Sequence, residues 1–197
     1  MQNKSIYESK YIHLNGFFQA VYCGSNFGNT PVYREMAEKF GTWIGENGHT
    51  LVYGASGKGL MGSVSDNVLK AGGKVYGVFA EVLYKREGCR EDLTETFIVP
   101  SIRERKKKMM ELGDLFIAFP GGPGTIEEIS EVISLTRIDV VKEKSIIFNL
   151  NGFYDSLKIL AEKMIEEGFV KAEEVANVKF IDTYEEMTAY IDSLNKK

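Results

Sequence analysis

Residues 115–133 read LFIAFPGGPGTIEEISEVI, and in them a short apolar run passes through a glycine- and proline-rich turn into a segment of helical period. The run at 115–119 has the length and composition of a buried strand, and Ile126, Ile129 and Ile133 recur at the spacing of one helix face. A buried strand that leads directly into a helix is the repeating part of a βαβ unit. This stretch therefore predicts an α/β fold.

The same alternation of strand and helix runs through the rest of the chain. Strands are predicted at residues 17–23, 50–53, 74–79, 96–99, 115–119, 145–149 and 178–181. Helices are predicted from Pro31 to the stop signal at Gly48 and at residues 60–71, 101–112, 125–139, 153–167 and 183–194. We expect a Rossmann-like, doubly wound, mostly parallel sheet of about seven strands with helices on both faces.

Length and charge restrict the class of protein. The 197 residues suffice for one core, so residues 1–197 are expected to form a single domain, with frayed ends at 1–15 and 196–197 and a charged loop at 80–95. The net charge of −4, with both signs interspersed, disfavours a nucleic-acid partner. No apolar run reaches the roughly 20 residues of a membrane span, and the polar start lacks a signal-peptide core. A cytoplasmic protein without a membrane partner is expected.

Cysteine and histidine give no sign of a metal site. Cys23 lies in a strand pattern and Cys89 in a charged segment, without the paired spacing of a zinc site or a disulfide framework, so both are expected to be reduced thiols. His13 and His49 are remote from each other and from any carboxylate cluster. No metal and no cofactor are expected.

Three glycine-rich turns follow predicted strands. They are residues 23–26, 54–59 and 120–125, and the carboxyl ends of parallel strands are where ligands bind in an open α/β sheet. Any one turn could simply reverse the chain, but three at one edge favour a phosphate site, with Thr125 adding a hydroxyl donor. None has the P-loop pattern or the dinucleotide pattern G-x-G-x-x-G with its acidic residue, so NTP hydrolysis and dinucleotide redox chemistry are not supported.

The helix predicted at 101–112 carries a run of cations. Ile102, Met109 and Leu112 form its apolar stripe, and Arg105 and Lys106 fall on the same stripe near its edges. Because a cation on the buried side of a helix needs an anionic partner, we predict a functional role for Arg105. The cations of this run that are expected to point outward are Arg103, Lys107 and Lys108.

The helix after the turn at 120–125 begins with acidic residues. Glu127, Glu128 and Glu131 lie opposite its apolar stripe, so periodicity alone predicts that they are solvated. A carboxylate near the start of a phosphate-binding helix would nevertheless lie within several Å of the sugar of a bound nucleotide, where it could order ribose hydroxyls or a water. The pattern does not choose between Glu127 and Glu128.

Together these motifs resemble those of the Lonely Guy family, the cytokinin riboside 5'-monophosphate phosphoribohydrolases. Residues 120–128 match the family pattern P-G-G-x-G-T-x-x-E completely. Supporting matches lie at residues 23–25, 59–62, 104–106, 152–154 and 167–169. The chain departs from the family at Ile102 and Arg103, where methionine and histidine are usual, and at Ala55 and Ser56, where further glycines are common.

The resemblance implies hydrolysis of AMP or N6-prenylated AMP to the free base and ribose 5-phosphate. It implies that Glu128 and Arg105 are the catalytic residues, with Arg105 lowering the pKa of Glu128 to keep it ionised. The residues expected to bind the substrate are Gly24, Ser25, Met61, Lys106, Gly121, Gly122, Gly124 and Thr125. It also implies a homodimer or a higher homo-oligomer.

Two other functions stand as alternatives to this hydrolysis, and the sequence agrees with only one of them. A non-catalytic carrier of a nucleotide or of the molybdenum cofactor would use similar glycine-rich turns, but it would not need the pair Arg105 and Glu128. A pyridoxal-dependent lysine decarboxylase is not supported, because nothing in the sequence marks a Schiff-base lysine or a partner for the pyridinium nitrogen.

Overall fold

The computed structural model describes residues 16–87 and 90–195. Its strands are β1 (Phe18–Tyr22), β2 (Thr50–Tyr53), β3 (Lys74–Ala80), β4 (Glu95–Val99), β5 (Leu115–Ala118), β6 (Lys144–Phe148) and β7 (Val178–Ile181). Its α-helices are α1 (Pro31–Glu46), α2 (Gly59–Lys70), α3 (Glu81–Glu87), α4 (Ile102–Leu112), α5 (Pro123–Arg137), α6 (Asp155–Glu166) and α7 (Tyr184–Asn195). Two short 3-10 turns, Leu150–Gly152 and Ala172–Val175, flank α6.

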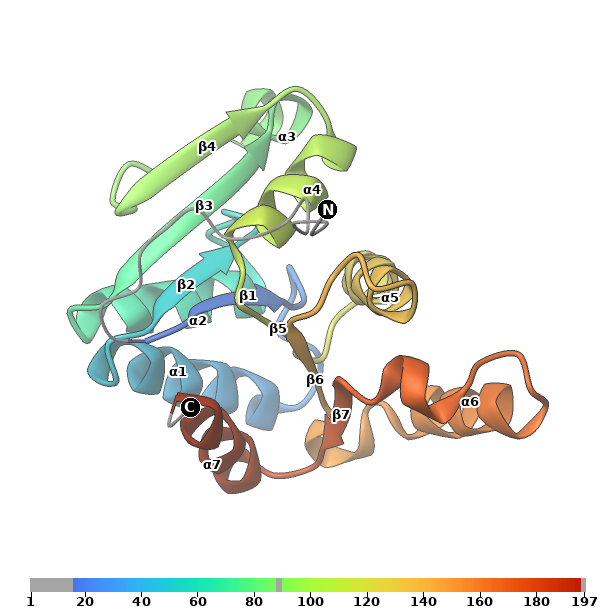
Figure 1. Cartoon of the computed structure of the whole chain (residues 1–197). Coiled ribbons are helices and arrows are strands. Elements are labelled where there is room, and N and C mark those ends of the chain that lie inside the picture. Colours follow the sequence, from blue (N-terminus) through green and yellow to red (C-terminus); the bar gives the residue numbers. More distant parts are fainter. Residues whose placement is uncertain (1–15, 88–89, 196–197) are drawn as a thin grey trace.

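The seven strands form one sheet in the order β4-β3-β2-β1-β5-β6-β7, and every pairing is parallel. The order runs in opposite directions from β1 and from β5, so the loops after these two strands leave toward opposite faces (Figure 1). The predicted doubly wound fold is confirmed, and the sheet is parallel throughout. Such a switch point is where ligands bind in open α/β sheets.

Helices cover both faces of the sheet (Figure 1). Alternate residues of a strand point to opposite faces, so Val21 packs in the layer of α1, α2 and α7, while Ala20 and Tyr22 pack in the layer of α4 and α5. The four residues of β2 and the four of β5 are all buried, as expected for central parallel strands. The rigid central strands thus hold the turns that follow β1 and β5.

Two sequence-based expectations about the helices α3 and α4 were wrong. Residues 81–87, predicted to lie in a loop, form α3, whose seven residues are too few for a periodic signal; Tyr84 packs edge-on against Phe79 with ring centroids 6.2 Å apart. Ile102, predicted to lie on the buried stripe of α4, is 36% exposed because it is the first residue of the helix. The expectations for residues 1–15, Cys89 and residues 196–197 lie outside the described residues.

Within residues 16–87 and 90–195, no helix is both long enough and apolar enough to cross a bilayer.

Candidate active site

The three glycine-rich turns meet at Gly24. Its backbone N–H donates to the carbonyl of Pro120 at 3.2 Å, and its carbonyl accepts from the N–H of Leu60 at 3.0 Å. Beside this junction lies a cavity of about 450 Å³, formed by the turns after β1 and β5 and by the start of α2, and its volume is within the ~300–1,000 Å³ of small-molecule sites. The cavity is lined by Cys23, Gly24, Ser25, Asn26, Phe27, Gly28, Tyr33, Leu60, Met61, Arg105, Pro120, Gly121, Gly122, Pro123, Gly124, Thr125, Glu128 and Phe153.

One wall of the cavity is the N-terminus of α5. Gly122 is the N-cap and has no side chain with which to cap the helix, and Pro123 follows at its first position. A Cβ on Gly121 would lie 2.2 Å from Oγ1 of Thr125, so the turn needs glycine there for space. The N–H groups of the first turn and the partial positive charge of the helix end suit an anion such as a phosphate.

Arg105 and Glu128 form a buried ion pair at the cavity. Nη1 of Arg105 donates to Oε1 of Glu128 at 3.1 Å, Nε of Arg105 donates to the carbonyl of Val78 at 3.1 Å, and each of the two side chains is only 11% exposed. The structure places Arg105 on the buried side of α4, as its spacing predicts. The prediction that Glu128 is solvated was wrong, because Arg105 crosses from α4 and covers it.

Burial raises the pKa of the Glu128 carboxyl above its ordinary value, and the positive charge of Arg105 opposes that rise without cancelling it. Arg105 therefore acts on Glu128 in the expected direction, but desolvation is the larger effect. A carboxylate with a raised pKa is a stronger base than an exposed glutamate. At the edge of a ligand cavity it is suited to accept a proton from water.

Lys106 does not line the cavity. Its Nζ lies 2.5 Å from Oε1 of Glu127 and 2.8 Å from Oε2 of Glu131, so it links α4 to the outer side of α5. The Glu127 side chain is 59% exposed and also lies outside the cavity lining. Of the two adjacent glutamates that the sequence pattern left open, Glu128 is the one that reaches the cavity.

An aromatic wall faces the same cavity, and sequence reasoning gave it no role. The rings of Tyr33 and Phe153 meet edge to face with centroids 5.9 Å apart, and Phe27 lies in the loop after β1. The hydroxyl of Tyr154, next to Phe153, donates to the carbonyl of Phe119 at 2.7 Å, which ties this wall to the strand that leads into the turn at 120–125. The available signal was Phe27, a large apolar residue in an otherwise polar Gly-Asn loop.

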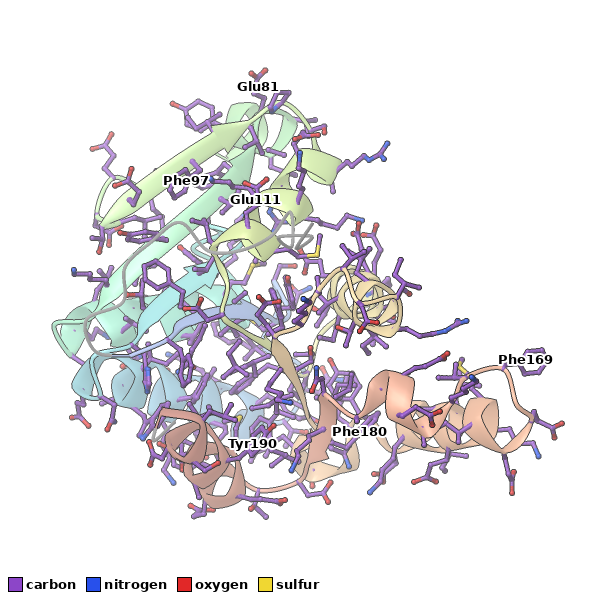
Figure 2. The ribbon with its side chains drawn as sticks, in the orientation of Figure 1. Glu81, Phe97, Glu111, Phe169, Phe180 and Tyr190 are labelled. Carbon is purple, nitrogen blue, oxygen red and sulfur yellow. The ribbon has the colours of Figure 1, made fainter. Side chains whose placement is uncertain are left out.

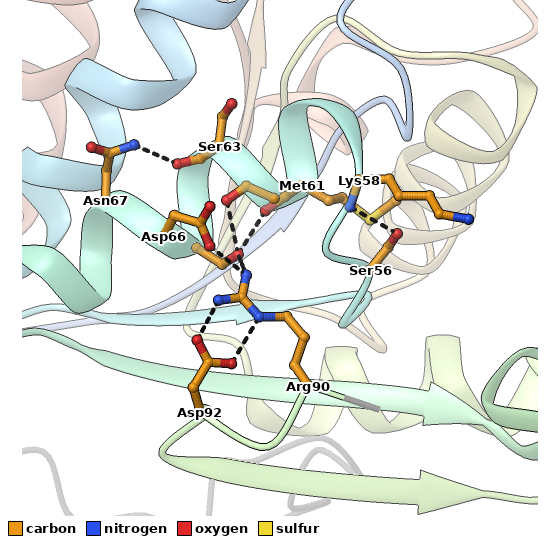
Figure 3. A network of polar contacts seen from close by, with 10 residues as sticks. Ser56, Lys58, Met61, Ser63, Asp66, Asn67, Arg90 and Asp92 are labelled. Atoms are coloured by element: carbon orange, nitrogen blue, oxygen red, sulfur yellow. Dashed lines mark hydrogen bonds and ion pairs between the residues drawn. The ribbon is translucent and has the colours of Figure 1, made fainter. Parts of the chain in front are cut away.

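A second arginine supports the helix that carries Met61 (Figure 3). Arg90 pairs with Asp92 and Asp66 at 2.6 Å each and donates to Oγ of Ser65 at 2.8 Å. It thereby fastens the segment before β4 onto α2, whose first turn presents Met61 to the cavity. The sequence contained no signal for this link, because its members are far apart in the chain.

No metal centre is found among the residues that the structure describes, since no three or more of their His, Cys, Asp and Glu side chains are grouped to hold an ion. His49 is a core residue. Its Nδ1 accepts from the N–H of Phe17 at 2.9 Å, and its ring packs 4.9 Å from that of Trp43.

Comparison with known proteins identifies the family. The sequence profile of a family described as "Possible lysine decarboxylase" matches residues 61–191. The chain is 39% identical over 150 residues to the cytokinin riboside 5'-monophosphate phosphoribohydrolase LOG7 of Arabidopsis thaliana, covering 76% of this chain and 69% of that protein. The chain belongs to the Lonely Guy family. The resemblance predicted from residues 120–128 is thus confirmed.

A second relative agrees with this assignment, and a solved structure shares the fold. The chain is 40% identical over 152 residues to a probable cytokinin riboside 5'-monophosphate phosphoribohydrolase, LOG4, of Oryza sativa subsp. japonica, covering 77% of this chain and 66% of that protein. A molybdenum cofactor binding protein from Rippkaea orientalis has a TM-score of 0.70 and 19% identity, covering 92% of this chain and 99% of its own. At that identity the likeness shows the shared fold alone.

Proposed function

We propose that this protein hydrolyses the N-glycosidic bond of a purine nucleoside 5'-monophosphate, releasing the base and ribose 5-phosphate. The observation that carries the proposal is the buried Arg105–Glu128 pair, which lines the same cavity as the N-terminus of α5. A helix N-terminus alone would serve a carrier as well as an enzyme. The buried carboxylate beside it supplies what bond cleavage needs.

In this proposal, Gly122, Gly124 and Thr125 bind the phosphate, and Glu128 lies beside the ribose. Gly24, Ser25 and Gly121 complete the phosphate end of the site. As the bond from C1′ to the base breaks, its electron pair leaves with the base and positive charge develops on the sugar. The Glu128 carboxylate stabilises that charge and takes the proton of the attacking water, as carboxylates do in glycoside hydrolases.

The base is assigned to the apolar part of the cavity. Met61 and Leu60 approach from α2, and Phe27, Tyr33 and Phe153 form the aromatic wall. Apolar and aromatic surfaces of this kind suit a purine ring and favour an apolar substituent on it. We therefore propose N6-prenylated AMP as the preferred substrate, with AMP as the weaker one.

A direct assay tests the reaction. The pure protein is incubated separately with AMP, isopentenyladenosine monophosphate and isopentenyladenosine, and release of the base is followed by chromatography. We expect release from the prenylated monophosphate above all, and little from the nucleoside, which lacks the phosphate. Tight binding of the monophosphates without release would instead establish the carrier function.

Helix α6 supports the expectation of a homodimer. None of its residues is buried. Ile159 is 65% and Leu160 50% exposed, neither lines the groove beside the helix, and Phe169 projects beyond its end (Figure 2). The other side of the helix borders this apolar groove of about 440 Å³ against α5, whose lining includes Lys158 and Glu162. A helix with apolar residues on both sides is normally buried. We propose that a second copy covers it, in a two-fold contact in which the same surface of each copy meets the other.

Ile159→Glu should weaken this dimer, because it buries an unpaired carboxylate in an apolar contact. We expect the dissociation constant to rise at least about 100-fold, from the ~3–5 kcal/mol cost of such a charge. Light scattering after size-exclusion chromatography measures the mass at each concentration. Val82→Glu is the matched control, since Val82 is also an exposed apolar residue, at 60%, but lies on α3. A monomeric mass for the wild-type protein would contradict the proposal.

A further inference from the structure

The guanidinium of Arg105 occupies a space that exists because residue 54 has no side chain. Gly54 follows β2, and a Cβ built on it would lie 1.8 Å from Nη2 and 2.9 Å from Cζ of Arg105. The same Cβ would lie 3.3 Å from Sδ of Met61. The guanidinium therefore rests directly on the backbone of Gly54.

The need for glycine at this position is one of space. Gly54 is absent from the glycines with positive φ, whereas Gly59, later in the same turn, has φ +56°. An alanine at residue 54 can therefore keep the backbone as it is. What it cannot keep is the guanidinium, because no carbon comes within 1.8 Å of a non-bonded nitrogen.

The remaining contacts of Arg105 define what is lost when it moves. Nε is held by the carbonyl of Val78 within β3, and Nη1 is held by Glu128. Movement away from Gly54 must break or lengthen at least one of these bonds, because both anchors belong to rigid elements. The side chain itself is long and can swing aside at moderate cost, so the fold should survive the substitution.

We propose that Gly54 is a positioning residue that reserves the space in which Arg105 pairs with Glu128. This role rests on the proposed hydrolysis, in which the pair acts on the ribosyl centre. Gly54 is the first residue of the glycine-rich turn at 54–59, and in this role it serves the pair Arg105 and Glu128. The turn otherwise contributes to the cavity only through the helix that follows it, since residues 54–59 are not among those that line it.

The test is a double-mutant cycle on kcat/KM for the monophosphate substrate. Gly54→Ala should lower kcat/KM about 100-fold, the loss expected from a displacement of roughly 1 Å at a reacting group. Gly57→Ala is the control in the same turn, because its Cβ would meet only Cδ and Cγ of Arg90, at the ordinary contact distances of 3.6 and 3.9 Å. In an Arg105→Ala background, Gly54→Ala should have no further effect, because the displaced group is gone. Equal activity of the two glycine variants, or multiplicative losses in the double variant, would overturn the proposal.

A crystal structure of Gly54→Ala provides a readout that does not depend on activity. We expect an unchanged backbone and a guanidinium beyond hydrogen-bonding distance of Glu128. An Arg105–Glu128 bond that stays in place would overturn the proposal even if activity fell. If the wild-type protein released no base from any nucleotide, the proposed hydrolysis would fail, and this structure would still decide whether Gly54 positions Arg105.

Discussion

Replacement of Glu128 by glutamine should lower kcat about 1,000-fold while changing the affinity for the nucleotide by no more than about threefold. Glutamine has the size of glutamate, and its amide oxygen can still accept from Nη1 of Arg105. The proposed phosphate contacts lie on the first turn of α5 and are not altered. What the variant lacks is the negative charge that stabilises the ribosyl cation and the basic oxygen that takes the proton of water.

Two measurements separate these effects. Calorimetric titration with the nucleotide reports affinity, and chromatography of the released base reports turnover. Glu127→Gln is the matched control, because the neighbouring carboxylate is 59% exposed and outside the cavity lining, and it should turn over like the wild type. Loss of binding and turnover to the same degree in Glu128→Gln would argue against a catalytic role for the carboxylate.

The second large effect is expected from Arg105→Gln, in rate and in pH dependence. Activity needs ionised Glu128 and should fall as the pH falls through its pKa. Burial holds that pKa above its ordinary value, and the charge of Arg105 pulls it down. Removing the cation therefore raises the pKa further, so the acidic limb of the rate profile should move to higher pH. We also expect at least about a 100-fold loss of kcat/KM on the alkaline side of the limb, because the cation that holds the substrate is gone.

A profile of kcat/KM against pH for the wild type and the variant checks this, since it reports groups of the free enzyme. Lys107→Gln removes a cation from the same helix, but its side chain is 53% exposed and pairs with Glu111, so its profile should match that of the wild type. A limb that stayed in place or moved to lower pH in Arg105→Gln would show that Glu128 is not the group that titrates.

Much of the fold was predictable, because it depends on local patterns. Each of the seven strands is a short apolar run, and Pro31 and Gly48 mark the two ends of α1 through backbone geometry that proline and glycine favour. The turn at 120–125 combines these same signals with a helix start. The short helix α3 was missed because seven residues span only about two turns, which is too few to establish a period.

The site was predictable only in part. The spacing in α4 placed Arg105 on the buried side of its helix, because helical geometry determines which residues share a face. The same reasoning placed Glu128 on the solvated side of α5, since periodicity treats each helix as if it packed against the sheet alone. It also could not find the link from Lys106 to Glu127 and Glu131, which joins two helices.

By itself, the sequence determined the α/β class, the glycine-rich turn at 120–125 and the family, because each is encoded in contiguous residues whose backbone preferences are local. Only the tertiary structure decided that Glu128 is buried, that Tyr33 and Phe153 form an aromatic wall, and that Gly54 leaves room for Arg105. These features join residues from different elements. Their physical cause is packing, in which the space and the solvent available to one side chain are determined by neighbours that are distant in the chain.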